Sequence, residues 1–114
     1  MLQSSGRFVV LEHDHPHRHW DFMLEADGVL RTWRLPTPPA DGLVVTAERI
    51  ADHRLAYLDH DGPVSGNRGV ATPWDKGEYV SADGCTIVLT GWRWSGSVRM
   101  LPADEALWSF VFGP

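Results

Sequence analysis

Histidines gather near the start of the chain. Four of the six histidines fall within seven positions, and a carboxylate follows two residues after the last of them: His13, His15, His17, His19 and Asp21. Imidazole nitrogens and carboxylate oxygens are ligands of zinc, manganese and other divalent cations in proteins. The histidines are not consecutive and lie within patterned sequence, unlike those of an affinity tag. This stretch therefore predicts a metal site.

The residues around the last histidine alternate as they would in a β-strand. Polar and apolar side chains fall on opposite faces: His19 and Asp21 against Trp20, Phe22 and Leu24. His19 and Asp21 thus point the same way, and a histidine from the preceding loop would complete a site with three protein ligands. Pro16 cannot donate to a strand ladder, which supports a loop there. Spacing alone does not choose among the three earlier histidines.

Length and composition limit the class of protein. The 114 residues have the length of one domain, so we interpret residues 1–114 as a single unit. No apolar run approaches the roughly 18 residues of a membrane span, and the first residues lack the basic and apolar regions of a signal peptide. We expect a cytoplasmic monomer that does not enter a membrane. Cys85 is the only cysteine, which excludes an intrachain disulfide and a cysteine-based zinc cluster.

The charge pattern bears on nucleic-acid binding. A net charge of -5 argues against tight, sequence-indifferent wrapping of long nucleic acid. Every basic residue except Lys76 is an arginine, the side chain suited to bidentate phosphate contacts. These arginines are dispersed, so most are interpreted as solvated surface charges. Only Arg18 and Arg54 lie beside histidines in the sequence and have a positional claim on function.

Short β-patterned runs separated by turn signals fill the rest of the chain. We predict strands at residues 7–12, 20–26, 29–35, 43–46, 70–74, 78–81, 86–90, 97–101 and 107–112. Asp27-Gly28 predicts a tight hairpin, residues 62–69 a surface loop, residues 75–77 a turn, and residues 102–106 one helical turn. The pattern predicts an all-β fold, a small closed or partly open barrel of about eight short antiparallel strands with at most one or two helical turns.

Several of these motifs together resemble a known family. The matching residues are Arg7-Phe8-Val9-Val10, His13, His19-Trp20-Asp21-Phe22, Asp27-Gly28-Val29-Leu30, Trp33, Pro36, Asp52-His53, Tyr57 and Trp74-Asp75-Lys76-Gly77. They resemble the 3'-phosphoesterase domain of bacterial DNA ligase D and its stand-alone relatives, and the likeness covers nearly the whole chain. The resemblance implies a β-barrel that uses manganese to remove a 3'-phosphate or a 3'-terminal ribonucleotide at DNA ends.

The resemblance also implies roles for individual residues. Carried onto this sequence, it makes His13, His19 and Asp21 the metal ligands, with manganese favoured and zinc or cobalt as alternatives. It places His53 and Tyr57 at the phosphate, as a general acid or hydrogen-bond donors. The implied partners are DNA or RNA/DNA 3' ends and a DNA ligase or other end-joining protein.

Several charged positions of the family pattern are changed here. Met23 stands where the family has an arginine, Thr37 where it has a lysine, Val45 near its second arginine, and Ala51 at an acidic residue. In a regular strand Arg34 would face away from the position of Thr37, so it is not expected to replace the lysine. Phosphate contacts would then have to come from loop arginines: Arg18, Arg54 and Arg68.

These departures leave three functions open. The first is a metal-dependent phosphoesterase that acts on nucleic-acid ends. The second is a metal- or DNA-end-binding module that has lost catalysis. The third takes His19, Asp21 and His53 as a two-His-one-carboxylate iron site of a cupin-like oxygenase, against which the short chain counts.

Overall fold

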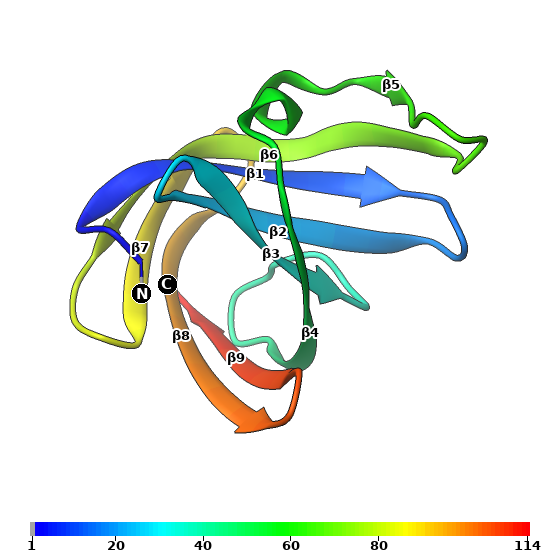
Figure 1. Cartoon of the computed structure of the whole chain (residues 1–114). Coiled ribbons are helices and arrows are strands. Elements are labelled where there is room, and N and C mark those ends of the chain that lie inside the picture. The colour runs from blue at the N-terminus through cyan, green and yellow to red at the C-terminus, as the bar shows by residue number, and fades with distance from the viewer. Residues whose placement is uncertain (1) are drawn as a thin grey trace.

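The chain forms one antiparallel sheet that curls into a closed barrel (Figure 1). A computed structural model describes residues 2–114, with nine strands and one 3-10 helix. The elements are β1 (Ser5–His13), β2 (His19–Ala26), β3 (Val29–Leu35), β4 (Val44–His53), η1 (Leu55–Asp59), β5 (Gly62–Pro63), β6 (Val70–Ser81), β7 (Thr86–Gly91), β8 (Ser95–Asp104) and β9 (Leu107–Gly113).

The strand order explains how the barrel closes. Neighbouring strands follow the order β1-β2-β3-β4-β9-β8-β7-β6, and β6 pairs back onto β1 over nine residue pairs. Eight strands thus form the wall, and the two-residue β5 pairs with β6 outside it. The predicted all-β barrel is confirmed, with closure removing the exposed edges of the eight wall strands.

The hairpin between β2 and β3 fixes the register at the histidine end. Asp27 and Gly28 have φ angles of 54° and 80°, as the two central residues of a type I′ turn require. The turn pairs Ala26 with Val29, and the ladder then continues to Asp21 opposite Arg34. Because directly opposite residues share a face of the sheet, Asp21 and Arg34 project on the same side.

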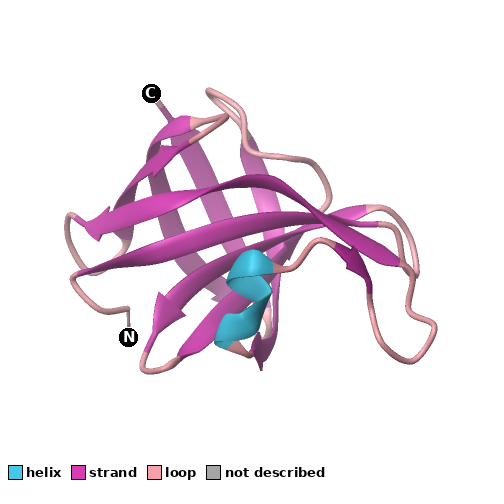
Figure 2. Cartoon of the chain, turned by 90° about the horizontal axis from the view of Figure 1, so that it is seen from above, coloured by secondary structure: helices cyan, strands magenta, loops and turns pink. Residues whose placement is uncertain are grey.

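The two faces of the sheet bury two separate apolar clusters. The larger fills the barrel, with alternate residues from strands all around the wall, among them Phe8, Phe22, Leu89, Val98 and Phe110. The smaller lies on the outer face of β1, β2, β3 and β6, where η1 and the segment after it cover the sheet (Figure 2). Its members include Val9, Leu11, Met23, Leu58 and Ala71. Within residues 2–114 no helix is long and apolar enough to cross a membrane.

The predicted turn at residues 75–77 is wrong. The chain continues through these residues as the single strand β6. Asp75 is 1% exposed, and its carboxylate accepts a hydrogen bond from the backbone N–H group of Lys76 at 2.9 Å. It also accepts hydrogen bonds from the backbone N–H groups of Arg93 and Trp94, at 2.9 and 3.0 Å, which hold this part of the strand in place. Gly77 lies against the carbonyl of Thr90, where a Cβ would not fit. Asp75 therefore binds the β7–β8 connection and Gly77 allows the close β6–β7 contact, and neither forms a turn.

The predicted helical turn at residues 102–106 is also wrong. β8 continues to Asp104, and Glu105, with φ of 47°, and Ala106 connect it directly to β9. The strand predicted at 43–46 extends to His53 as β4, and the predicted loop at 62–69 contains the short β5. Strand pairing across the barrel thus overrides several local turn signals.

Candidate metal centre and phosphate pocket

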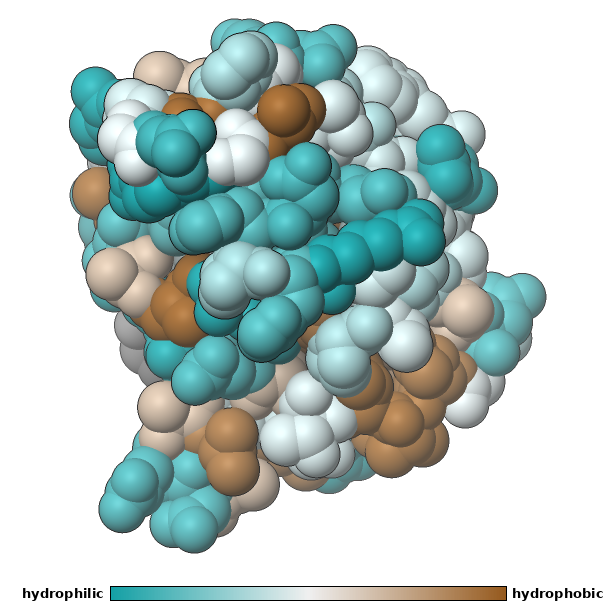
Figure 3. All heavy atoms as spheres, turned by 90° about the vertical axis from the view of Figure 1, so that its right-hand side faces the viewer, coloured by the Kyte–Doolittle hydropathy of each residue, from teal (hydrophilic) through white to brown (hydrophobic). Residues whose placement is uncertain are grey.

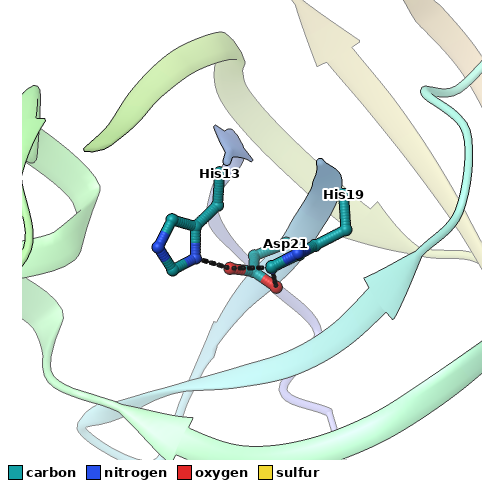
Figure 4. A group of neighbouring side chains, drawn as sticks. All are labelled: His13, His19 and Asp21. Atoms are coloured by element: carbon teal, nitrogen blue, oxygen red, sulfur yellow. Dashed lines mark hydrogen bonds and ion pairs between the residues drawn. The ribbon is translucent and has the colours of Figure 1, made fainter. Parts of the chain in front are cut away.

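The end of β1 and the start of β2 bring three ligand-type side chains together. His13 and His19 are directly opposite each other in the ladder, and Asp21 follows two residues along β2 (Figure 4). Because these residues alternate with Trp20 and Phe22, which face into the barrel, the three side chains lie on its outer face. Figure 3 views the molecule from the side on which β1 ends and β2 begins, and hydrophilic residues cover most of that face.

The ligand-type atoms of this group converge. His19 Nε2 lies 3.1 Å from Asp21 Oδ1 and 3.2 Å from Oδ2, and His13 Nδ1 lies 3.6 Å from Oδ2. One such atom from each residue lies within 4.8 Å of the others. His19 and Asp21 are each 4% exposed, so solvent does not separate them. Among residues 2–114 this is the one such group of His, Cys, Asp and Glu residues.

Backbone carbonyls hold the far side of each imidazole. His19 Nδ1 donates to the carbonyl oxygen of His17 at 2.8 Å, and His13 Nε2 donates to that of Arg68 at 2.7 Å. A carbonyl only accepts, so these ring nitrogens carry the hydrogens. In a neutral ring the other nitrogen then presents a lone pair, and both of these nitrogens face Asp21. This is the outer hydrogen bonding that orients histidine ligands at metal sites.

These residues fit a divalent cation. Asp21 Oδ1 is fully buried and has no hydrogen-bond partner, which is costly for an anionic oxygen. Two imidazole lone pairs and a carboxylate point into one small space, an arrangement that a positive ion would stabilise. Imidazole with carboxylate suits manganese, zinc or cobalt, and three protein ligands leave positions for water or substrate.

A pocket of about 250 Å³ adjoins this group and contains the other predicted site residues. His53, at the end of β4, and Tyr57, on η1, both line it, and their rings meet edge to face with centroids 5.2 Å apart. His53 Nδ1 lies 3.0 Å from both the carbonyl of Ala51 and Thr32 Oγ1. This leaves His53 Nε2 without a partner in the described part of the chain. His53 is not a member of the ligand group. The histidine that joins His19 and Asp21 is His13, and not His53 as the two-His-one-carboxylate interpretation requires.

The three predicted phosphate-binding arginines occupy different places. Arg18 lies outside the pocket, where it pairs with Glu12 at 3.2 Å and stacks over Trp20 at 5.0 Å. Arg54 is exposed just before η1 and also lies outside the pocket. Arg68 lines the pocket, but its guanidinium donates to the carbonyl and hydroxyl of Ser65.

Sequence reasoning missed Arg34. It was grouped with the dispersed surface arginines, yet it lines the pocket from β3. The signal was available, because the Asp27-Gly28 turn sets a ladder that pairs position 21 with position 34. The position of Thr37, beyond the end of β3, says little about Arg34, because the neighbour that matters is Asp21 across the hairpin.

A second pocket, of about 200 Å³, shares no lining residue with the first. It lies beside Trp33, Cys85, Met100 and Trp108 and contains no histidine. Among the described residues no metal-binding group of side chains adjoins it. The residues that could bind a metal or a phosphate are therefore concentrated around the first pocket, which contains the histidines.

Comparison with known proteins shows the family of this chain. A sequence model of the DNA Ligase D 3'-phosphoesterase domain matches residues 11–103, a span that includes the ligand group, His53 and Tyr57. The chain belongs to this family. The DNA ligase D 3'-phosphoesterase resemblance seen in the sequence is thus confirmed.

Curated relatives carry this family's domain within much longer chains. The multifunctional non-homologous end joining DNA repair protein LigD of Mycobacterium tuberculosis is 39% identical over 118 residues, covering 92% of this chain and 16% of that protein. The multifunctional non-homologous end joining protein LigD of Pseudomonas aeruginosa is 35% identical over 82 residues, covering 68% of this chain and 10% of that protein. This 3'-phosphoesterase-family chain therefore corresponds to a small part of those relatives.

Proposed function

We propose that this domain is a metal-dependent phosphoesterase that removes a 3'-phosphate or a 3'-terminal ribonucleotide from DNA ends. Membership of the DNA ligase D 3'-phosphoesterase family supports the reaction class. The observation that carries the proposal is the convergence of His13, His19 and Asp21, with the far nitrogen of each imidazole held by a backbone carbonyl. Manganese is the favoured cation, with zinc or cobalt as alternatives.

In this proposal the ligand group, His53 and Tyr57 have different roles at the phosphoryl group. His13, His19 and Asp21 would hold a divalent cation, which when bound would polarise a phosphoryl oxygen and lower the pKa of a coordinated water. His53 Nδ1 donates to the carbonyl of Ala51 and lies 3.0 Å from Thr32 Oγ1, so its Nε2 is free for the substrate, to which the protonated ring would donate a proton or a hydrogen bond. Tyr57 borders the same pocket, and its hydroxyl is a further donor to the developing charge.

The substrate and partners follow from the relatives' names as part of the proposal. The curated relatives are named as non-homologous end joining proteins. We infer that this domain acts on DNA or RNA/DNA 3' ends and works beside a DNA ligase or other end-joining protein.

A second function, binding without catalysis, has one observation in its favour. Met23 points to the same pocket and is 1% exposed within the outer apolar cluster, so this β2 position offers no charge to a phosphate. A domain that holds the metal and the DNA end but does not cleave would keep the ligand group and lose this kind of contact.

Release of 3'-phosphate from a labelled primer-template with added manganese tests the proposal. We expect the wild type to release phosphate, His13→Ala to lose at least about 100-fold in rate, and His17→Ala to keep the wild-type rate. His17 is a matched control because its imidazole is exposed and only its backbone carbonyl touches the group. Equal rates for the wild type and His13→Ala would refute the assigned ligands. Binding of metal and of 3'-phosphorylated DNA without release would establish the second function.

A further inference from the structure

Arg34 is an arginine placed at the candidate metal centre from the neighbouring strand. It lies directly opposite Asp21 in the β2–β3 ladder and lines the pocket that also contains His13, His53 and Tyr57. Directly opposite residues of antiparallel strands have Cβ atoms about 5 Å apart. The guanidinium is therefore carried on a rigid strand next to the carboxylate of the ligand group.

Arg34 has no partner within the described part of the chain. Its buried Nε makes no hydrogen bond, and its guanidinium forms no ion pair with Asp21 or with another carboxylate of residues 2–114. Most other arginines are engaged, as Arg7 is with Glu25 and Arg49 with Asp52. A buried, unpaired guanidinium donor beside a pocket is unusual, because leaving such a donor unsatisfied is costly.

Apart from the histidines, the other strand residues at this pocket carry no positive charge. Met23, on β2, is apolar and packs in the outer cluster. The hydroxyl of its ladder partner Thr32 is already hydrogen-bonded to the carbonyl of Leu30 and to His53 Nδ1. Arg68 reaches the pocket from an exposed loop and bonds to Ser65. Arg34 is thus the strand-borne guanidinium of the pocket within residues 2–114.

We propose that Arg34 binds the phosphate of the substrate and makes the pocket selective for a terminal phosphate monoester. The inference deepens the proposed function and rests on it for the reaction that follows binding. A planar guanidinium matches two phosphate oxygens at once, and a terminal monoester offers about one more negative charge and more free oxygens than a diester. Arg34 on β3 and His13 on β1 lie on either side of β2, which carries Asp21, so a phosphate that enters the pocket would meet both the guanidinium and the ligand group.

Binding measured without turnover tests this inference. The probes are inorganic phosphate and three primer-templates that end in a 3'-phosphate, a 3'-hydroxyl or a 3'-terminal ribonucleotide, titrated by calorimetry in EDTA. We expect the wild type to prefer the 3'-phosphate end and Arg34→Met to lose roughly 10- to 100-fold of that affinity. Arg34→Lys keeps the charge but not the planar fork, so its affinity should fall between the two.

Arg99→Met is the matched control, because Arg99 is exposed on β8 and lies outside the pocket. It should bind all the probes as the wild type does. Thermal unfolding of each variant shows whether it is folded, and Arg34→Lys carries the test should Arg34→Met not fold. Unchanged preference for the 3'-phosphate end in both Arg34 variants would overturn the inference.

The same titrations separate this inference from the proposed function. Arg34-dependent phosphate binding in a protein that releases no phosphate with manganese would uphold the inference and refute the phosphoesterase. Manganese-dependent release of phosphate, with unchanged phosphate affinity in the Arg34 variants, would uphold the phosphoesterase and refute the inference about Arg34.

Discussion

Replacing Asp21 by asparagine should stabilise the metal-free protein while removing its response to metal. In the structure the Asp21 carboxylate is 4% exposed, and its Oδ1 has no hydrogen-bond partner. The nitrogens that face it, His13 Nδ1 and His19 Nε2, carry lone pairs in neutral rings because the opposite nitrogens donate to carbonyls. An asparagine of the same shape carries no charge, and its amide N–H groups can donate to those lone pairs.

The size of the effect follows from the burial of that oxygen. Leaving a buried polar group unsatisfied costs about 1–3 kcal/mol, so Asp21→Asn should gain about that much in metal-free buffer. For a domain of this size a change of 1 kcal/mol moves Tm by about 4 °C. A metal at 1,000 times its Kd would add about 4.1 kcal/mol to the wild type, more than the largest gain expected for the variant, and nothing comparable to the variant. The order of the two stabilities should therefore reverse when metal is added.

Thermal unfolding at pH 8, with EDTA and then with manganese, tests this prediction. Asp61→Asn is a matched control, because Asp61 is exposed and lies outside the pocket. A variant less stable than the wild type in EDTA would refute the argument about the unpaired carboxylate. A manganese shift equal to that of the wild type would refute the assignment of Asp21 as a ligand.

Two further predictions concern the elements around the site. Leu58→Ala removes the 5% exposed η1 side chain from the outer cluster and should lower the free energy of unfolding in urea by about 2–4 kcal/mol. It should also speed amide hydrogen exchange in η1 while the amides of the barrel strands stay protected. Equal protection in η1 and the barrel strands would contradict a separate outer cluster. Hydrogen bonds from the Arg7 side chain and N–H hold the pKa of Glu25 below its usual 4.5, so the carboxylate stabilises the fold above that pH and the contribution is lost as pH falls through the lowered value. Glu25→Gln should cost at most about 1 kcal/mol at pH 7, because Arg7 is largely exposed, and should match the wild type in melts below the lowered pKa.

The alternation along β2 and the Asp-Gly hairpin were the parts of the site that the sequence could predict. Both depend on local geometry: side chains on a strand alternate, and a two-residue turn fixes the ladder beyond it. The face shared by His19 and Asp21 follows from the first. The position of Arg34 follows from the second, although the prediction did not use it.

The choice among the earlier histidines depended on contacts that spacing does not encode. His13 meets His19 because the β1–β2 connection returns the chain in that register, and its ring is oriented by a carbonyl 55 residues away in the sequence. The continuous β6 was unpredictable for a similar reason. The turn-like residues around Asp75 are held extended by backbone donors from the β7–β8 hairpin.

The two carbonyls that orient the imidazoles have a consequence for mutagenesis. Both acceptors, in His17 and Arg68, belong to the main chain, so replacing either side chain leaves the oxygen in place. Alanine scanning would therefore show no effect of these two hydrogen bonds, although they orient both imidazoles. Changing the length of the Val64–Gly69 turn would instead shift the oxygen that holds His13, so insertions and deletions there report on a contact that point substitutions cannot remove.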